Sequence, residues 1–209
     1  MSVLLNEILS AVLQIIVLTL IPFVFFLFRK DKSISFFKYI GLTRTTSKAV
    51  WLSVAASVFF LTGALLLVSI STDVRQIMTT PPSITGKLRV MGMQFYTIAI
   101  LLIIACFKTS LSEEIFFRGF IAKRCFRAFG FTAGNIAQSV IFGLLHLILF
   151  WALTKAEWTF LILIFCFSFS GAFIIGFIKE KYGNGSIVPG WVAHGLGNTV
   201  SYFVIAFVI

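Results

Sequence analysis

Uncharged apolar residues fill six long stretches of the chain, and nearly all charged residues lie between them. The stretches are residues 8–28, 49–72, 90–107, 128–154, 158–178 and 182–209. A helix that crosses a bilayer needs about 20 mostly apolar residues, and each stretch is that long or nearly so. None places a polar residue at every third or fourth position, as a helix of a soluble protein does, and none alternates with period two, as barrel strands do. The pattern predicts six transmembrane helices.

These helices are predicted to form one all-α integral membrane bundle. The chain contains no linker, low-complexity tract or internal repeat, so residues 1–209 are interpreted as a single polytopic membrane domain, with residues 90–209 as its motif-bearing catalytic core. The first stretch is interpreted as a retained helix, because its start carries Glu7 and no positive charge, and no small-residue cleavage site precedes Arg29. Residues 34–40 form either a short interfacial helix or a loop with scattered apolar residues.

Composition agrees with a membrane protein. Hydrophobic residues make up 59% of the chain and charged residues 11%, and the mean hydropathy is +1.06, whereas about a quarter of the residues in globular domains are charged. The high hydrophobicity excludes a disordered chain, and three cysteines without a regular spacing exclude a disulfide scaffold. The formal net charge of +10 would suggest nucleic-acid binding in a soluble protein. In a membrane protein, basic loops lie beside anionic lipid headgroups, so we expect the lipid bilayer and no nucleic acid as a partner.

The basic residues also predict the orientation of the chain, because loops rich in Lys and Arg stay in the cytoplasm. The basic residues predicted to be cytoplasmic are Arg29, Lys30, Lys32, Lys38, Arg44, Lys48, Lys123, Arg124, Arg127, Lys179 and Lys181. The loops predicted to lie outside carry fewer basic residues, namely Arg75, Lys87, Arg89 and Lys155. This alternation predicts a multi-pass protein of the cell membrane with both termini outside.

Ionisable residues inside a membrane are costly and mark functional sites. The chain has five, which are Glu113, Glu114, Arg118, His146 and His194, and the two histidines are the only ones in the chain. Glu114 and Arg118 are four residues apart, so on an α-helix they share a face and can pair. Glu113 points about 100° away from Glu114 on such a helix and has no partner there. We interpret Glu114 and Arg118 as a structural pair and Glu113 as a general base, with one buried ionic cluster of all three as the alternative.

A second set of polar residues comes from the fourth and sixth stretches. Phe142 and His146 are four residues apart, as are His194 and Asn198, so each pair shares a helix face. Two histidines and a carboxylate form a catalytic or metal-binding set, and a side-chain amide can hold an oxyanion. For each histidine, an interhelical hydrogen bond is the structural alternative. The sequence contains no HExxH motif, which excludes a zincin.

Three motifs in this region together resemble a known family. Residues 113–118 match EExxxR, residues 142–146 match FxxxH, and residues 194–198 match HxxxN. In this order, and on successive hydrophobic helices, they resemble the CAAX protease and bacteriocin-processing (CPBP, or Abi) family, to which the type II CAAX prenyl endopeptidases belong.

The resemblance implies an intramembrane endopeptidase whose active site is enclosed by the helices of the third, fourth and sixth stretches. It implies that Glu113 and His146 activate water, and that His194 and Asn198 hold the carbonyl oxygen as it becomes an oxyanion. The residues that would support this site are Glu114, Arg118 and Phe142. Members of the family are described both as metalloproteases and as glutamate-dependent proteases. Two alternatives therefore stay open. Either the site holds zinc through Glu113, His146 and His194, or it works without a metal.

The implied substrate is a hydrophobic or lipid-modified peptide, or a membrane protein. The eukaryotic branch acts on prenylated C-terminal tripeptides, and the prokaryotic branch is tied to bacteriocin processing, self-immunity and peptide-signal maturation. Because hydrolysis needs water, we expect a wet cavity that opens to the cytoplasm or sideways to the bilayer. The alternatives are a non-enzymatic membrane adaptor that binds a sensor kinase or a transporter, and a small transporter or proton relay.

Overall fold

The computed structural model describes residues 3–29, 33–70, 72–154 and 156–209, and every regular element in these ranges is a helix. The predicted all-α membrane bundle is confirmed. Four helical segments are long and apolar enough to cross a membrane, namely α1 (Val3–Leu27), α3 (Ser47–Ile70), the stretch Phe95–Thr154 and α8 (Trp158–Lys181).

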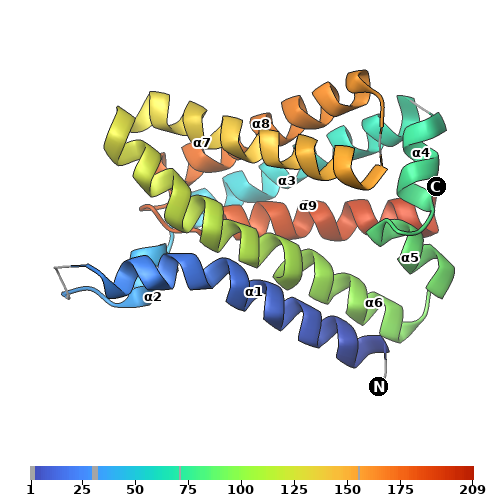
Figure 1. Ribbon diagram of the computed structural model, residues 1–209, viewed down its shortest axis with the longest axis horizontal. Helices are drawn as coiled ribbons and strands as arrows, with labels where there is room; N and C mark the ends of the chain where they lie inside the picture. The colour runs from blue at the N-terminus through green and yellow to red at the C-terminus, as the bar shows by residue number, and fades with distance from the viewer. Residues whose placement is uncertain (1–2, 30–32, 71, 155) are drawn as a thin grey trace.

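The six predicted helices are all present within these segments and α9. The stretch Phe95–Thr154 contains two of them, because the backbone at Gly130 (φ 73°, ψ 178°) breaks α7 (Ala122–Thr154) and turns the chain back. The sixth is α9 (Val188–Phe207), which carries His194 and Asn198 and is not one of the four segments that are long and apolar enough to cross a membrane by length and composition. Both termini lie at the same end of the bundle, at the right in Figure 1.

The helix that carries the two glutamates departs from α-helical geometry. It begins as α6 (Phe95–Leu102) and continues as two π-helical segments, η1 (Ile103–Leu111) and η2 (Glu114–Ile121), before α7. In a π-helix the backbone hydrogen bonds run from i to i+5, so side chains turn differently from those of an α-helix. Glu113 lies between the two segments and keeps α-helical backbone angles (φ −69°, ψ −40°), so the angle of about 100° between Glu113 and Glu114 stays a prediction. Such segments are frequent at functional sites.

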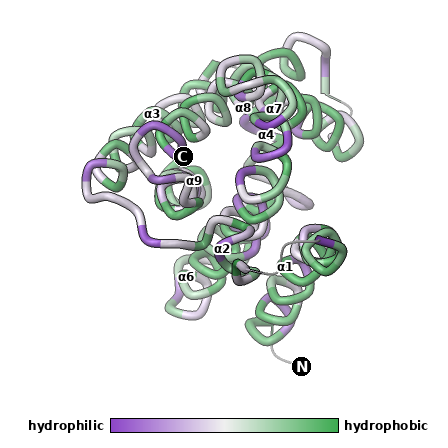
Figure 2. Tube along the Cα trace, turned by 90° about the vertical axis from the view of Figure 1, so that its left-hand side faces the viewer, coloured by the Kyte–Doolittle hydropathy of each residue, from purple (hydrophilic) through white to green (hydrophobic). Residues whose placement is uncertain are grey.

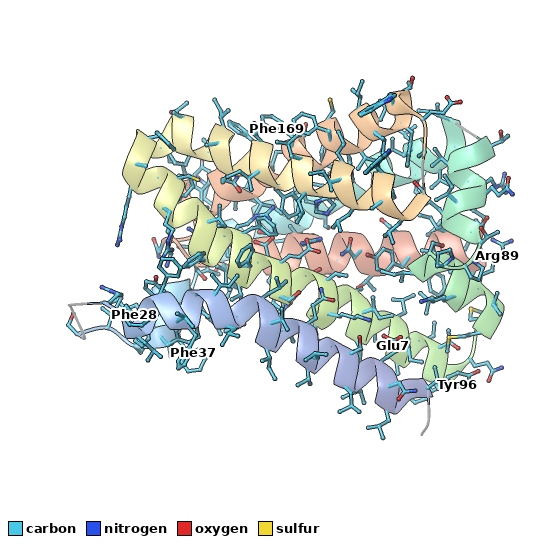
Figure 3. The ribbon with its side chains drawn as sticks, viewed as in Figure 1. Glu7, Phe28, Phe37, Arg89, Tyr96 and Phe169 are labelled. Carbon is cyan, nitrogen blue, oxygen red and sulfur yellow. The ribbon has the colours of Figure 1, made fainter. Side chains whose placement is uncertain are left out.

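Helix α1 lies beside this π-helical segment on the outside of the bundle (Figures 1 and 2). The Nζ atom of Lys108 lies 3.0 Å from Oε2 of Glu7, which Figure 3 labels on α1. The amide of Gln14 donates to the Lys108 carbonyl at 2.7 Å. On its outer face α1 exposes Leu13 and Ile16 by 62% and 55%, as expected for side chains in contact with lipid.

Helix α9 occupies the interior and packs against α3, η1, α5 and α8. At the end of the bundle opposite the termini lies α2 (Phe36–Ile40), which confirms the helical alternative for residues 34–40. The helices α4 (Thr72–Thr79) and α5 (Ile84–Met91) lie at the end that holds the termini (Figure 1). Three of the basic residues used to predict the orientation, Lys30, Lys32 and Lys155, lie outside the described residues. The orientation in the membrane stays a prediction.

Candidate active site

The predicted catalytic residues line one cavity of about 640 Å³. Glu113 comes from the junction of η1 and η2, His146 from α7, and His194 and Asn198 from α9. Three helices thus bring together the four residues. These are the helices of the third, fourth and sixth predicted stretches, as the sequence pattern implies.

Glu114 and Arg118 form an ion pair at the base of this site. The Nε atom of Arg118 lies 3.4 Å from Oε1 of Glu114, and the two side chains are 1% and 0% exposed. Glu113, by contrast, is 20% exposed and faces the cavity. This contrast in burial agrees with a structural pair beside a carboxylate that can reach a substrate. Their roles in catalysis stay predictions.

The position of Glu114 depends on a residue that the motif analysis missed. A Cβ atom added to Gly190, in the first turn of α9, would lie 2.0 Å from Oε2 of Glu114 and 2.7 Å from its Cδ atom. Only a residue without a side chain lets α9 approach the buried carboxylate this closely. No spacing in the sequence links residues 114 and 190, so the contact could be found only in three dimensions.

The aromatic ring of Phe142 contacts both Arg118 and His146. The Arg118 guanidinium carbon is 4.2 Å from the centre of the ring, which is within the range of a cation–π interaction. The rings of Phe142 and His146 have their centres 4.3 Å apart, and Phe117 packs edge-on against Phe142 from the other helix. Phe142 is itself buried. It therefore fixes the guanidinium and the imidazole relative to each other.

The hydrogen bond of His146 determines which of its ring nitrogens carries the proton. Nδ1 lies 3.0 Å from the carbonyl oxygen of Phe142. A carbonyl oxygen can only accept a hydrogen bond, so Nδ1 carries the hydrogen and donates it. In the neutral ring, Nε2 is then unprotonated and can accept a hydrogen from water in the cavity.

His194 has a carboxylate opposite each of its ring nitrogens. Nε2 lies 4.0 Å from Oε2 of Glu113, and Nδ1 lies 3.6 Å from Oε1 of Glu114. Both distances exceed that of a hydrogen bond, so the contacts are electrostatic. The histidine of the third motif is thus placed directly against both glutamates of the first.

Two hydroxyl residues that the motif analysis missed orient Asn198. Its amide nitrogen donates to Thr109 Oγ1 at 3.1 Å and to Ser110 Oγ at 3.4 Å. The Thr109 hydroxyl in turn donates to the Ile104 carbonyl at 2.9 Å, so its oxygen is an acceptor for the amide. Tyr202, one turn beyond Asn198, also lines the cavity. Thr109 and Ser110 lie on the helix of the glutamates, and they fix the amide relative to Glu113.

The zinc alternative was tested on the geometry of the same side chains. Within the described ranges, no group of three or more His, Cys, Asp and Glu side chains is arranged to hold a metal ion. Glu113, His146 and His194 line one cavity without forming such a group. They do not fit a ready zinc site in this arrangement, and we derive no step through a metal.

The remaining wall of the cavity is mostly apolar and extends toward α4 and α5. It includes Leu67, Met78, Leu149 and Phe160, and it reaches the exposed Thr80 at the end that holds the termini. At the opposite end, hydrogen bonds join the loops, such as those from Ile187 N to the Gly41 carbonyl and from Ser186 Oγ to the Thr43 carbonyl. The expected opening toward the cytoplasm or sideways to the bilayer stays a prediction.

Comparison with known proteins identifies one related family. The family model described as type II CAAX prenyl endopeptidase, Rce1-like, matches residues 95–200, which is half of the chain. The matched segment runs from the first residue of α6 into α9 and includes all four predicted catalytic residues. No curated protein and no solved structure gave a match.

Proposed function

Because the chain belongs to the Rce1-like family of type II CAAX prenyl endopeptidases, we propose that it is an intramembrane endopeptidase acting on a hydrophobic or lipid-modified peptide, in which Glu113 and His146 activate water. The observation that carries this proposal is the shared cavity, in which Glu113, His146, His194 and Asn198 from three helices meet beside an apolar wall. A peptide signal or a bacteriocin is a substrate of this kind.

In the proposed mechanism, water attacks the carbonyl carbon of the scissile peptide bond. The Glu113 carboxylate accepts a proton from the water, and Nε2 of His146 accepts a hydrogen bond from the same molecule and orients it. The carbonyl oxygen becomes an oxyanion, which His194 and the Asn198 amide stabilise. For this the amide exchanges one of its bonds, to Thr109 or Ser110, for a bond to the oxyanion.

The intermediate then collapses and the carbon–nitrogen bond breaks. Glu113 returns its proton to the leaving nitrogen, so the products are a carboxylic acid and an amine, and the enzyme is unchanged. Low exposure of the site strengthens each of these electrostatic interactions relative to water. The apolar wall would hold the side chains or the lipid of the substrate while its peptide bond lies against Glu113.

The experiment that tests this proposal is a comparison of peptides from cells that make the wild type, Glu113→Gln or Glu157→Gln at matched protein level. Glu157 is exposed, outside the cavity and chemically identical, so it is the control for loss of a carboxylate. We expect a peptide whose cleaved terminus appears with the wild type and Glu157→Gln but not with Glu113→Gln. The same cleavages in all three would refute the proposal, and a cellular phenotype retained in Glu113→Gln without any cleaved peptide would favour the adaptor alternative.

A further inference from the structure

A second cavity, of about 470 Å³, lies at the end of the bundle opposite the termini. It shares no lining residue with the catalytic cavity. Its wall comes from α2 and the loop that follows, from the start of α7, and from the end of α8 and the following turn, and it includes Lys38, Arg44, Lys123, Arg127, Glu180 and Asn184. The peptidase mechanism uses none of these residues.

The charge of this cavity is strongly positive. Four cationic side chains face it, two from α2 and the loop that follows and two from the start of α7, and Glu180 is the single carboxylate among its lining residues. Glu180 is already paired with the ammonium group of Lys179, which is fully buried behind it. The four remaining cations repel one another, and an anion bound between them would offset this repulsion. The cavity thus has the charge of a site for an anion.

The walls of the cavity are held in place by hydrogen bonds between the loops. Lys123 Nζ donates to the Tyr39 carbonyl at 2.7 Å, which fixes the ammonium group against the end of α2. Thr46 Oγ1 donates to the Tyr182 carbonyl at 2.6 Å. Gly41, in the left-handed region at φ 80°, leaves no room for a Cβ atom, which would lie 2.9 Å from the Gly185 carbonyl oxygen and 3.2 Å from Lys123 Nζ. The backbone around the cavity and the ammonium group of Lys123 are therefore held in place.

The surroundings of the cavity place it at the level of the lipid headgroups. Phe37, next to Lys38, is 61% exposed, and Phe28, at the end of α1, is 84% exposed, and both lie at this end of the bundle (Figure 3). Phenylalanine side chains beside basic residues are typical of segments that lie at the boundary between acyl chains and headgroups. We propose that this cavity binds the phosphate group of an anionic glycerophospholipid through Lys38, Arg44, Lys123 and Arg127.

The proposal is tested by binding, which is independent of peptidase activity. Dihexanoyl phosphatidylglycerol is titrated into the purified full-length protein in neutral micelles, and the thermal unfolding midpoint is followed. The test variant is Arg44→Gln/Arg127→Gln, since both residues are exposed. The control is Lys87→Gln/Arg89→Gln, which removes the same charge from exposed residues at the other end; Figure 3 labels Arg89 there.

We expect the wild type and the control to bind with the same dissociation constant. The test variant should bind about 30-fold more weakly, since each basic residue near an anionic headgroup strengthens binding about fivefold. Equal weakening in both double variants would overturn the proposal in favour of diffuse surface charge. An equal rise of the midpoint with inorganic phosphate alone would also overturn it, in favour of a soluble anion. If the test variant is less stable before lipid is added, Lys38→Gln/Arg44→Gln replaces it under the same criteria.

Discussion

The Nε2 atom of His194 lies 4.0 Å from Oε2 of Glu113, across the contact between α9 and the helix of the glutamates. The two groups are close enough to act on the same substrate carbonyl, one on the attacking water and the other on the oxygen. Residues that act as a unit lose their effects together, because either loss already disables the step.

We therefore predict that Glu113→Gln and His194→Gln are not additive. Each single variant should lower kcat on a hydrophobic reporter peptide by about 10²-fold or more, the range of general acid–base and oxyanion contributions. The kcat of the double variant should lie within a few-fold of the kcat of the slower single variant. Multiplied losses in the double variant would instead mean that the two residues act in separate steps.

The buried pair of Glu114 and Arg118 predicts an effect on stability. Glu114→Ala leaves the guanidinium, which is 1% exposed, without its carboxylate. Breaking a buried ion pair in this way costs about 3–5 kcal/mol of unfolding free energy. The control is Glu157→Ala, which removes an exposed carboxylate next to the start of α8, and for which a change of about 0.5 kcal/mol or less is expected. Denaturant unfolding in detergent checks both, and equal losses would contradict the structural assignment of Glu114.

Gly190 and Gly195 lie on the same helix and give a matched test of close packing. In Gly190→Ala the new methyl group would lie 2.0 Å from Oε2 of Glu114, which is fully buried and cannot move aside freely. Overpacking of this kind costs about 1–3 kcal/mol. In Gly195→Ala the nearest atoms, of Cys106, are 3.8 Å away, and alanine in a helix is favoured by about 0.5–1 kcal/mol. We expect a lower unfolding midpoint for Gly190→Ala only; equal midpoints would contradict the close approach.

Much of this arrangement could be predicted from the sequence, because the bilayer imposes a simple pattern. The uncharged stretches predicted the six helices. Glu113, His146 and His194 could be identified as ionisable groups on these helices. The contact of Gly190 with Glu114 could not be predicted, since it depends on how two helices distant in sequence approach. The π-helical segments on either side of Glu113 could not be predicted either, because residue spacing alone cannot distinguish i+4 from i+5 backbone hydrogen bonding.

Which end of the cavity is open depends on contacts between loops that a charge pattern cannot predict. The sequence pattern correctly places basic loops at one end, but it does not show that these loops are hydrogen-bonded to each other. The position of α4 and α5 beside the apolar wall likewise follows from side-chain packing rather than from a pattern. What the charge pattern does predict is which end faces the cytoplasm, and that prediction remains to be measured.

We predict that substitution of Phe142 lowers the activity more than it lowers the stability. Phe142→Leu removes the ring that lies 4.2 Å from the Arg118 guanidinium and 4.3 Å from the His146 ring. Because a misplacement of a catalytic group by 1 Å can cost about 10²-fold, we expect kcat to fall by about 10–10²-fold. The control is Phe150→Leu, which also lines the cavity but packs against Phe160. Equal kcat values for the two variants would show that Phe142 does not position His146.

The orientation of the cavity is tested with single cysteines at the two ends of the bundle. Thr80 is exposed and lines the end of the cavity near α4, and Ser47 is exposed at the start of α3, at the opposite end. With Cys106, Cys125 and Cys166 replaced by alanine, each site is treated with a maleimide that cannot cross the membrane.

The positive-inside rule predicts that Thr80→Cys is labelled in intact cells, and that Ser47→Cys is labelled only after the cells are permeabilised. Labelling of both sites in permeabilised cells is the control for accessibility. This result would mean that peptides enter the catalytic cavity from the outer side, as expected for a substrate in or leaving the outer leaflet. The reverse pattern would contradict the predicted topology and would place the opening beside Thr80 in the cytoplasm, where substrates would enter before export.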